Sequence, residues 1–298
     1  MKSVQGLVVR SLSGVYEVAA EDGSFVSCKP RGKFRRDGIS PLVGDRVRIT
    51  VQKDESGSVE EILPRKNVFI RPPVANIDCM VLFACAVTPV TDFFLLDRMI
   101  AVAEDRECET VICINKSDLD PGEDYFSLYS RAGFRTIRTS AVTGEGIEEL
   151  RDAIRGKVCA FTGNSGVGKS SVLNALEPGF SLKVGEVSEK LGRGKHTTRH
   201  VELFPLSCGA RIADTPGFSA FDTEVMGMTV KENVQFSFRE FAPYIGKCRF
   251  SDCAHRRESD CAVREAVEAG MIAPSRYESY VKLYEQAMEY RTWEKSEI

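Results

Sequence analysis

The chain has 298 residues, of which 43% are hydrophobic and 28% are charged, and its formal net charge at pH 7 is −3. These values are ordinary for a globular protein of about two or three domains, and they exclude nucleic-acid binding through a globally basic surface. The N-terminus has no export signal, and the longest mainly apolar stretch, residues 77–87, is far shorter than the roughly 20 residues that span a bilayer. We therefore expect a cytoplasmic monomer without membrane contact, whose ten cysteines are reduced thiols or metal ligands.

Short β-rich runs separated by turn signals fill the N-terminal part of the chain. These runs cover residues 7–10, 15–19, 25–28, 46–51 and 59–63. Five short strands in about sixty residues are typical of a small closed barrel. We predict an OB-like barrel over residues 1–66, with an SH3-like barrel as the alternative, because periodicity does not separate the two.

A basic segment with one aromatic residue lies between the third and fourth of these runs. Its residues of interest are Lys29, Arg31, Lys33, Phe34, Arg35 and Arg36. Cationic side chains beside an aromatic ring on a small barrel are suited to hold nucleic-acid phosphates and to stack on bases. We favour RNA binding by these residues over the alternative, a solvated loop without a partner.

Strand and helix patterns alternate after a proline-containing segment, residues 64–74, which we interpret as a hinge. The expected strands are residues 76–87, 109–115, 136–139, 157–162, 201–205 and 211–214, and the expected helices are residues 92–104, 124–132, 147–154 and 171–176. Such alternation predicts a mainly parallel sheet with helices on both faces. We assign residues 67–225 to this central domain.

A glycine-rich motif joins one of these strands to the helix after it. The sequence GNSGVGKSS matches G-x-x-x-x-G-K-[ST], in which the backbone N–H groups and the lysine bind phosphates and the next hydroxyl binds Mg²⁺. The expected phosphate-binding residues are Gly163, Asn164, Ser165, Gly166, Val167, Gly168, Lys169, Ser170 and Ser171. Lys169 is also expected to stabilise charge during phosphoryl transfer, and Ser170 to be a ligand of Mg²⁺.

Two further motifs select the base. Asn115, Lys116 and Asp118 form N-K-x-D after a strand, and the Asp118 carboxylate can accept both hydrogen bonds that the N1 and N2 edge of guanine donates. Ser140 and Ala141 follow the next strand, where a backbone N–H can reach the guanine O6. A site built to bind this edge rejects adenine, so the sequence predicts a site for GTP.

A D-T-P-G motif ends a later strand. Its Asp214 is expected to hold Mg²⁺ through water, and the Gly217 N–H is expected to contact the γ phosphate. The next residue, Phe218, stands where many GTPases have a glutamine that orients water, and a phenyl ring cannot take that role. Hydrolysis must therefore use another residue or a partner. A GTP-dependent RNA-binding module with little hydrolysis is the alternative, and an ATP-using P-loop enzyme is a third.

Three thiols and one imidazole lie close together near the C-terminus. Cys248, Cys253, His255 and Cys261 give the spacing C-x₄-C-x-H-x₅-C. These four ligands complete a tetrahedral Zn²⁺ shell and leave no position for a catalytic water, so we predict one structural zinc ion. Helical patterns surround the cluster, and we assign residues 226–298 to a zinc-binding helical domain.

The order of the nucleotide motifs is permuted. In translation-factor-type GTPases the phosphate loop comes first, whereas here the base motifs precede it. Strand ends can build the same site in any chain order if the strands keep their places. With the stretches PLVGDRV at 41–47, GRGKHTTRH at 192–200 and RYxSY at 276–280, the chain resembles the RsgA (YjeQ) family of circularly permuted GTPases.

This resemblance covers essentially the whole chain and carries several expectations. It implies an α/β fold with a circularly permuted P-loop GTPase domain, flanked by an N-terminal OB-like β-barrel and a C-terminal α-helical zinc-binding domain. It implies GTP hydrolysis stimulated by the small ribosomal subunit, in late maturation of that subunit and with rRNA as a partner. It also implies that Thr197 or Thr198 completes the Mg²⁺ shell and that His196 is catalytic.

Overall fold

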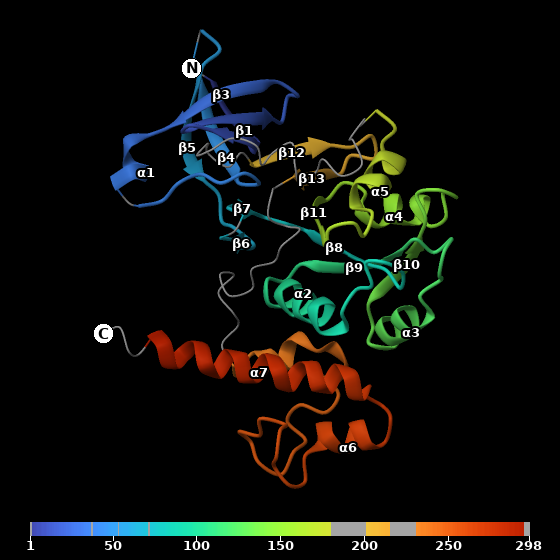
Figure 1. Cartoon of the computed structure of the whole chain (residues 1–298). Coiled ribbons are helices and arrows are strands. Elements are labelled where there is room, and N and C mark those ends of the chain that lie inside the picture. Colours follow the sequence, from blue (N-terminus) through green and yellow to red (C-terminus); the bar gives the residue numbers. More distant parts are fainter. Residues whose placement is uncertain are drawn as a thin grey trace.

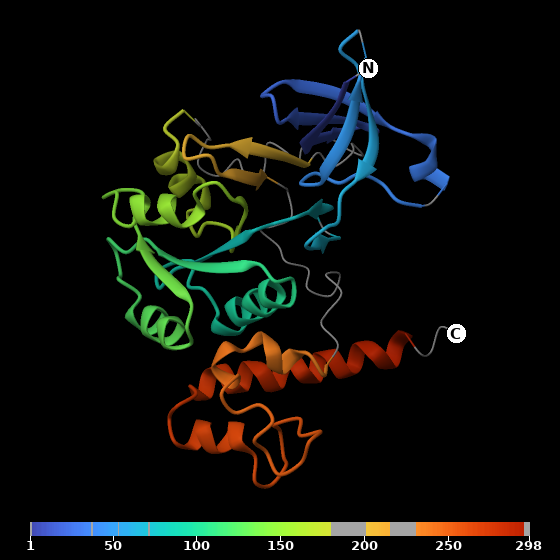
Figure 2. The ribbon, with the colours of Figure 1, turned by 180° about the vertical axis from the view of Figure 1, so that it is seen from behind.

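The computed structural model describes residues 2–36, 38–52, 54–70, 72–179, 201–214 and 231–294. Figure 1 shows three parts: an N-terminal barrel, a central α/β domain and a C-terminal helical domain. The barrel and the helical domain lie on opposite sides of the central domain, as the view from behind also shows (Figure 2). Among the described helices, none is long and apolar enough to cross a membrane.

The barrel closes in the strand order β1-β2-β3-β5-β4, because β1 also pairs with β4. Its strands are β1 (Lys2–Leu12), β2 (Val15–Ala20), β3 (Phe25–Pro30), β4 (Arg46–Val51) and β5 (Gly57–Ile62). Alternate residues point inward and are fully buried, among them Val18, Val47 and Ile49. The parallel pairing of β3 with β5, beside otherwise antiparallel neighbours, supports the predicted OB-like barrel over the SH3-like alternative.

The basic segment differs from its prediction in one respect. It folds into the end of β3 and a short helix, α1 (Gly32–Arg36), and Lys29, Arg31 and Lys33 are exposed. Phe34, however, is only 8% exposed and belongs to the barrel core. The prediction that Phe34 stacks on a base is therefore wrong for this conformation, because a single turn of helix directs the ring inward.

The described residues of the central domain form a six-strand sheet in the order β10-β9-β8-β11-β13-β12. Its strands are β8 (Cys79–Ala84), β9 (Glu109–Asn115), β10 (Arg135–Thr139), β11 (Val158–Gly163), β12 (Val201–Pro205) and β13 (Arg211–Asp214). All neighbours are parallel except β12, which runs antiparallel to β13. The carboxyl ends of the five parallel strands therefore share one edge of the sheet.

Helices cover both faces of this sheet, as predicted. They are α2 (Phe93–Asp105), α3 (Glu123–Arg131), α4 (Ile147–Ile154) and α5 (Lys169–Leu176). The buried strand β8 shows the division, because Met80 and Leu82 pack in the cluster that contains α2 and α3, whereas Val81 and Phe83 pack with α4 and α5. A strand buried on both faces reads as a continuous apolar run, which is how β8 appears in the sequence.

The barrel and the central sheet are joined more firmly than a hinge would allow. β1 pairs with β12, so that one continuous sheet runs through both domains. The connecting segment carries β6 (Val68–Phe69) and β7 (Val74–Ala75), and Arg65 within it donates two hydrogen bonds to the fully buried Asp45, at 2.7 and 2.8 Å. Gly44 sits so close that a Cβ there would lie 1.9 Å from the Ala75 oxygen. The hinge prediction was wrong, because polar contacts and backbone packing fix this segment.

Residues 231–294, the described part of the C-terminal domain, form two short 3₁₀ helices and two α-helices. They are η1 (Val234–Ser237), η2 (Arg239–Phe241), α6 (Ala262–Glu268) and α7 (Pro274–Glu294). Its core is aromatic, since Phe238, Phe241 and Tyr280 are at most 1% exposed and contact one another. The domain packs through η1 and α7 on α2 of the central domain (Figure 1).

Candidate nucleotide site and metal cluster

The glycine-rich loop follows β11 directly and ends at the first turn of α5. Two of its glycines are required by both conformation and space. Gly163 has φ +143° and a Cβ there would lie 2.5 Å from the Phe83 oxygen, whereas Gly168 has φ +100° and a Cβ would lie 2.2 Å from the Asn115 amide nitrogen. The loop can therefore approach a ligand closely with its backbone, as a phosphate cradle requires.

Lys169 lies inside the curve of this loop. Its ammonium donates to the carbonyl oxygens of Gly163 at 2.6 Å and Asn164 at 2.8 Å. Burial lowers the pKa of Lys169 to about 8. Negative phosphate oxygens beside this ammonium would favour its charged form, so the arrangement fits a phosphate-binding lysine.

Asn115 connects the base motif to the phosphate loop. It ends β9, is 2% exposed, and donates from its side-chain amide to the Val167 carbonyl at 2.8 Å. Its side-chain oxygen accepts a hydrogen bond of 3.0 Å from the Thr139 hydroxyl at the end of β10. One buried amide thus connects the ends of β9 and β10 to the phosphate loop, a role that the sequence did not reveal.

The two base motifs meet at the ends of β9 and β10. The Ser140 hydroxyl, fully buried, donates to the exposed Asp118 carboxylate at 2.6 Å. The same hydroxyl accepts the backbone N–H groups of Val142 and Thr143, both at 3.2 Å. Asp118 is therefore held by one oxygen and keeps acceptor capacity for a base, beside the turn that contains Ala141.

Lys116 directly follows the last residue of β9, two residues before Asp118. Its backbone is left-handed, with φ +63°, and its ammonium donates to the Thr88 carbonyl at 2.7 Å. Thr88 belongs to the loop between β8 and α2, whose Pro89 also lies beside Gly166 of the phosphate loop. This loop therefore contacts both the base motif and the phosphate loop.

The remaining predicted residues divide into two groups. Asn164, Ser165, Ser170 and Ser171 lie on the loop and the first turn of α5, and Asp214 ends β13 beside β11. The predicted residues His196, Thr197, Thr198 and Gly217, together with Phe218, lie outside the described residues. The described strand ends accordingly bring together the phosphate, base and Asp214 motifs, as the sequence predicted.

The four predicted metal ligands converge in the C-terminal domain. The Nδ1 atom of His255 lies 3.4 Å from the sulfurs of Cys248 and Cys261 and 3.5 Å from that of Cys253, and Cys248 and Cys261 sulfurs are 3.9 Å apart. Tetrahedral zinc with its usual bond lengths requires about 3.8 Å between sulfurs and about 3.6 Å between sulfur and nitrogen. The cluster therefore has the donor set of a closed zinc site. These four distances are close to the tetrahedral values, and all four ligand atoms lie within 4.8 Å of one another.

Residues outside the ligand set hold the ligand loop in place. The hydroxyl groups of Tyr277 and Tyr280 on α7 donate to the carbonyl oxygens of His255 and Ala254, each at 2.8 Å. The Glu258 carboxylate accepts the backbone N–H groups of Ala254, Arg256 and Arg257, at 2.8 to 3.0 Å. Both tyrosines therefore connect α7 to the ligand loop, a role that the sequence did not predict.

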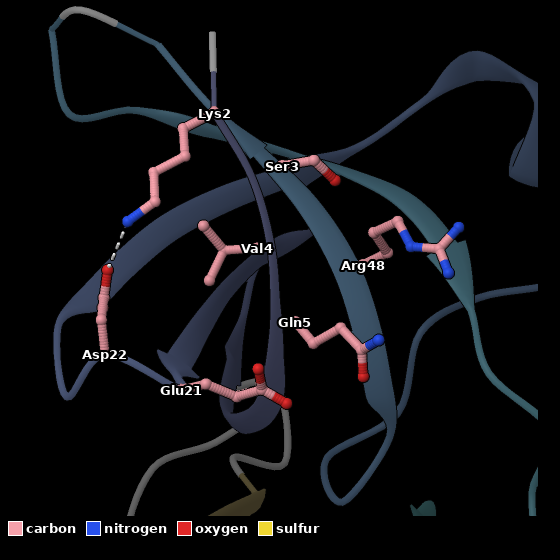
Figure 3. Close-up of a pocket in the computed structure, with 7 residues that line it drawn as sticks. All are labelled: Lys2, Ser3, Val4, Gln5, Glu21, Asp22 and Arg48. Atoms are coloured by element: carbon pink, nitrogen blue, oxygen red, sulfur yellow. Dashed lines mark hydrogen bonds and ion pairs between the residues drawn. The ribbon is translucent and has the colours of Figure 1, made fainter.

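A shallow pocket lies on the barrel, with a volume of about 540 Å³. Figure 3 labels its lining residues, which are Lys2, Ser3, Val4, Gln5, Glu21, Asp22 and Arg48. Two basic and two acidic side chains balance in charge, and the Lys2 ammonium bonds to Asp22 at 3.2 Å. None of these residues belongs to the nucleotide motifs or to the basic segment, so we assign the pocket no role in either.

A phosphate loop and a guanine-selective motif at the ends of parallel strands, in permuted chain order, define a circularly permuted P-loop GTPase. Family comparison agrees: the RsgA GTPase profile matches residues 62–224, and the RsgA N-terminal domain profile matches residues 5–59. The chain belongs to the RsgA GTPase family.

Individual relatives cover nearly the full length. The chain is 46% identical over 292 residues to the small ribosomal subunit biogenesis GTPase RsgA of Caldanaerobacter subterraneus, covering 97% of each sequence. Among solved structures, YjeQ from Thermotoga maritima superposes with a TM-score of 0.82 at 38% identity, covering 96% of this chain and 99% of that one. The circularly permuted GTPase YloQ gives a TM-score of 0.80 at 32% identity, covering 97% and 96%.

Proposed function

We propose that this GTPase hydrolyses GTP to GDP and phosphate during late maturation of the small ribosomal subunit, and that the subunit stimulates its turnover. The observation that carries the proposal is the joint placement of the phosphate loop and the Asp118 motif at one sheet edge, within a chain that matches RsgA over its length. Relatives named as small ribosomal subunit biogenesis GTPases supply the partner. This role implies a cytoplasmic location.

Each part of the site has a distinct task in this proposal. The loop amides from Gly163 to Ser171 and the Lys169 ammonium bind the phosphates and stabilise the charge that develops on them. Asp118 accepts the guanine N–H groups while Ser140 holds its carboxylate in place, and the Ala141 N–H binds the guanine O6. Asn115 and Lys116 keep the base motif in register with the phosphate loop.

Two metal ions complete the proposed cofactors. Mg²⁺ would neutralise phosphate charge when GTP is bound, and the oxygen donors for it are Ser170, Asp214 through water, and Thr197 or Thr198. One Zn²⁺ held by the four ligands of the cluster would stabilise the fold of the C-terminal domain. We keep the domain boundaries at residues 1–66, 67–225 and 226–298, and we propose a monomer.

His196 is the proposed catalytic residue, because Phe218 cannot orient water. His196→Ala should lower the stimulated turnover by about 10²-fold to 10⁴-fold, as expected for a lost water-positioning or acid–base group, with little change in GTP affinity. His200→Ala is the matched control and should retain most activity. An unchanged rate for His196→Ala would remove this histidine from the reaction.

RNA binding is proposed for the basic segment that runs from the end of β3 into α1, through Lys29, Arg31, Lys33, Arg35 and Arg36. The test is co-sedimentation with purified ribosomal subunits at fixed salt, because phosphate contacts are salt-dependent. We expect retention by small subunits with a non-hydrolysable GTP analogue and weaker retention with GDP. Equal retention by small and large subunits, or with both nucleotides, would contradict the proposed partner.

A further inference from the structure

The imidazole of His255 has a polar partner on each side of the ring. Its Nδ1 faces the three cysteine sulfurs, and its Nε2 lies 2.9 Å from the side-chain oxygen of Gln235. His255 is 2% exposed, so water does not replace this second contact. Gln235 belongs to η1, twenty residues before the histidine in the chain.

The orientation of the Gln235 amide decides which ring nitrogen carries the proton. The Gln235 amide nitrogen donates to the Glu232 carbonyl at 3.0 Å, which leaves the side-chain oxygen turned to His255. An amide oxygen only accepts, so the Nε2 of His255 must be the donor. A neutral imidazole protonated at Nε2 has its free lone pair on Nδ1, which is the atom among the sulfurs.

We propose that Gln235 is the outer partner of the metal site: it holds His255 in the Nε2–H tautomer and aims the Nδ1 lone pair at the zinc ion. Such partners fix ring orientation and raise ligand basicity, and their loss typically costs about 10-fold to 100-fold in metal affinity. The inference rests on the proposed occupation of the cluster by zinc.

Gln235 lies on η1, a segment that also contacts the central domain. η1 packs on α2 of the central domain, and the residue directly before Gln235, Val234, is buried in the C-terminal core. The histidine of the metal site is thus oriented from a segment that contacts the nucleotide-binding domain, outside the loop that carries the four ligands. Retention of zinc should therefore depend on η1 as well as on the ligand loop.

Nitrogen-15 spectra of histidine-labelled protein test the tautomer directly. The chain has three histidines, so His255 can be assigned by comparison with His196→Ala and His200→Ala. We expect one imidazole with a protonated Nε2 and a metal-bound Nδ1 in the zinc-loaded protein. Zinc on Nε2 would overturn the proposal.

The rate of zinc release to a chromogenic chelator tests the role of Gln235. Gln235→Leu, which removes the acceptor, should release zinc about 10-fold to 100-fold faster, whereas Gln235→Glu, which keeps an acceptor oxygen, should stay within a few-fold of the parent. Asn233→Ala, a change at an exposed amide just before η1, is the matched control and should behave as the parent.

The outcomes separate this inference from the zinc site itself. A parent protein purified without bound zinc would overturn both. Stoichiometric zinc in the parent, with parent-like release from Gln235→Leu, would overturn only the role of Gln235. Equal acceleration in Gln235→Leu and Gln235→Glu would also overturn it, because the loss would then follow from packing and not from the hydrogen bond.

Discussion

The nucleotide site and the metal cluster are built in opposite ways. The nucleotide site uses residues from Asn115 to Asp214, which meet because five parallel strands end at one edge. The metal cluster uses four side chains within residues 248–261, and the loop that carries them has little regular structure of its own. The first site therefore depends on a fold that exists without the ligand, whereas the second should depend on its ligand for the fold.

Helix α2 is contacted from both sides: the loop that precedes it contacts the nucleotide site, and α7 of the C-terminal domain packs on it. On one side, the loop before α2 contacts Lys116 and Gly166 of the nucleotide site. On the other side, Arg276 of α7 donates to Asp97 of α2 and to Glu240 of η2, each at 2.6 Å. Arg276 and Asp97 are 1% and 0% exposed, so this ion pair is buried between the domains. Substitutions in the metal cluster, in the nucleotide site and in this ion pair can therefore test whether the two sites differ in the way described.

Loss of a metal ligand should have the largest effect. Cys253→Ser should release zinc and unfold the C-terminal domain, because structural zinc supplies roughly 10 kcal/mol or more of folding free energy in small zinc domains. GTP affinity should change less than tenfold, since the strand ends remain. Hydrogen exchange of α6 and α7, compared with that of β9 and β10, checks the unfolding, and titration with a fluorescent GTP analogue checks the affinity.

Cys208→Ser is the matched control for that change, because Cys208 is a partly exposed thiol outside the cluster. If α7 in zinc-free Cys253→Ser were protected from hydrogen exchange as well as in the parent, the fold of the C-terminal domain would not depend on zinc. That result would contradict the proposed difference between the two sites.

Arg276→Met should have the next largest effect, since it leaves the Asp97 and Glu240 carboxylates without their partner. Removing one member of a buried ion pair typically costs about 3–5 kcal/mol in the free energy of unfolding. Arg249→Met, in an exposed pair with Asp260, is the control and should cost less than about 1 kcal/mol. Urea unfolding monitored by circular dichroism measures both.

The loss at Arg276 should also depend on pH. Burial raises the pKa of the Asp97 carboxyl, and the charge of Arg276 opposes that rise. Without Arg276 the pKa of Asp97 in the folded protein rises further above its unfolded value of about 4. The variant therefore loses stability as the pH rises from the unfolded pKa to the folded pKa of this carboxyl. The destabilisation should therefore be smaller at pH 5 than at pH 8. An equal loss at both values would show that the charge of Asp97 is not its cause.

Gly168→Ala tests the dependence of the nucleotide site on backbone geometry. Its Cβ would overlap the Asn115 amide and would sit at a positive φ, so we expect GTP binding about 100-fold weaker. Gly156→Ala controls for the positive φ alone, because no described residue beyond its two chain neighbours lies within 4 Å of the added Cβ. Equal affinity in the two variants, measured by titration with a fluorescent GTP analogue, would contradict the proposed contact with Asn115.

Asp118→Asn should give the smallest effect, on the choice of base. The amide donates where the carboxylate accepts, so relative binding of xanthosine triphosphate over GTP should rise about tenfold or more. Competition between the two nucleotides provides the measurement. An unchanged preference for guanine would remove Asp118 from the base contact.

Local patterns accounted for most of the elements and for the ligands. β9 and α4 have the predicted bounds, because a continuous apolar run and a helical period each identify one element. The metal ligands followed from spacing within one short segment. The nucleotide motifs followed because each keeps its own residue pattern at a strand end.

Contacts between distant segments could not be predicted in this way. The pairing of β1 with β12 depends on how the barrel stands beside the sheet, which no local pattern records. The burial of Phe34 and the buried charge of Arg276 are decided by the surfaces that pack on them. Gln235 carries no signal of its own, because a lone glutamine acquires its role only when His255 is folded against it.

Phosphate release under multiple turnover, with and without purified small ribosomal subunits, tests the central claim most directly. The proposed function predicts slow release by the protein alone and a large increase when small subunits are added, with large subunits as the control. Turnover that small subunits leave unchanged, or that ATP supports as well as GTP, would contradict it.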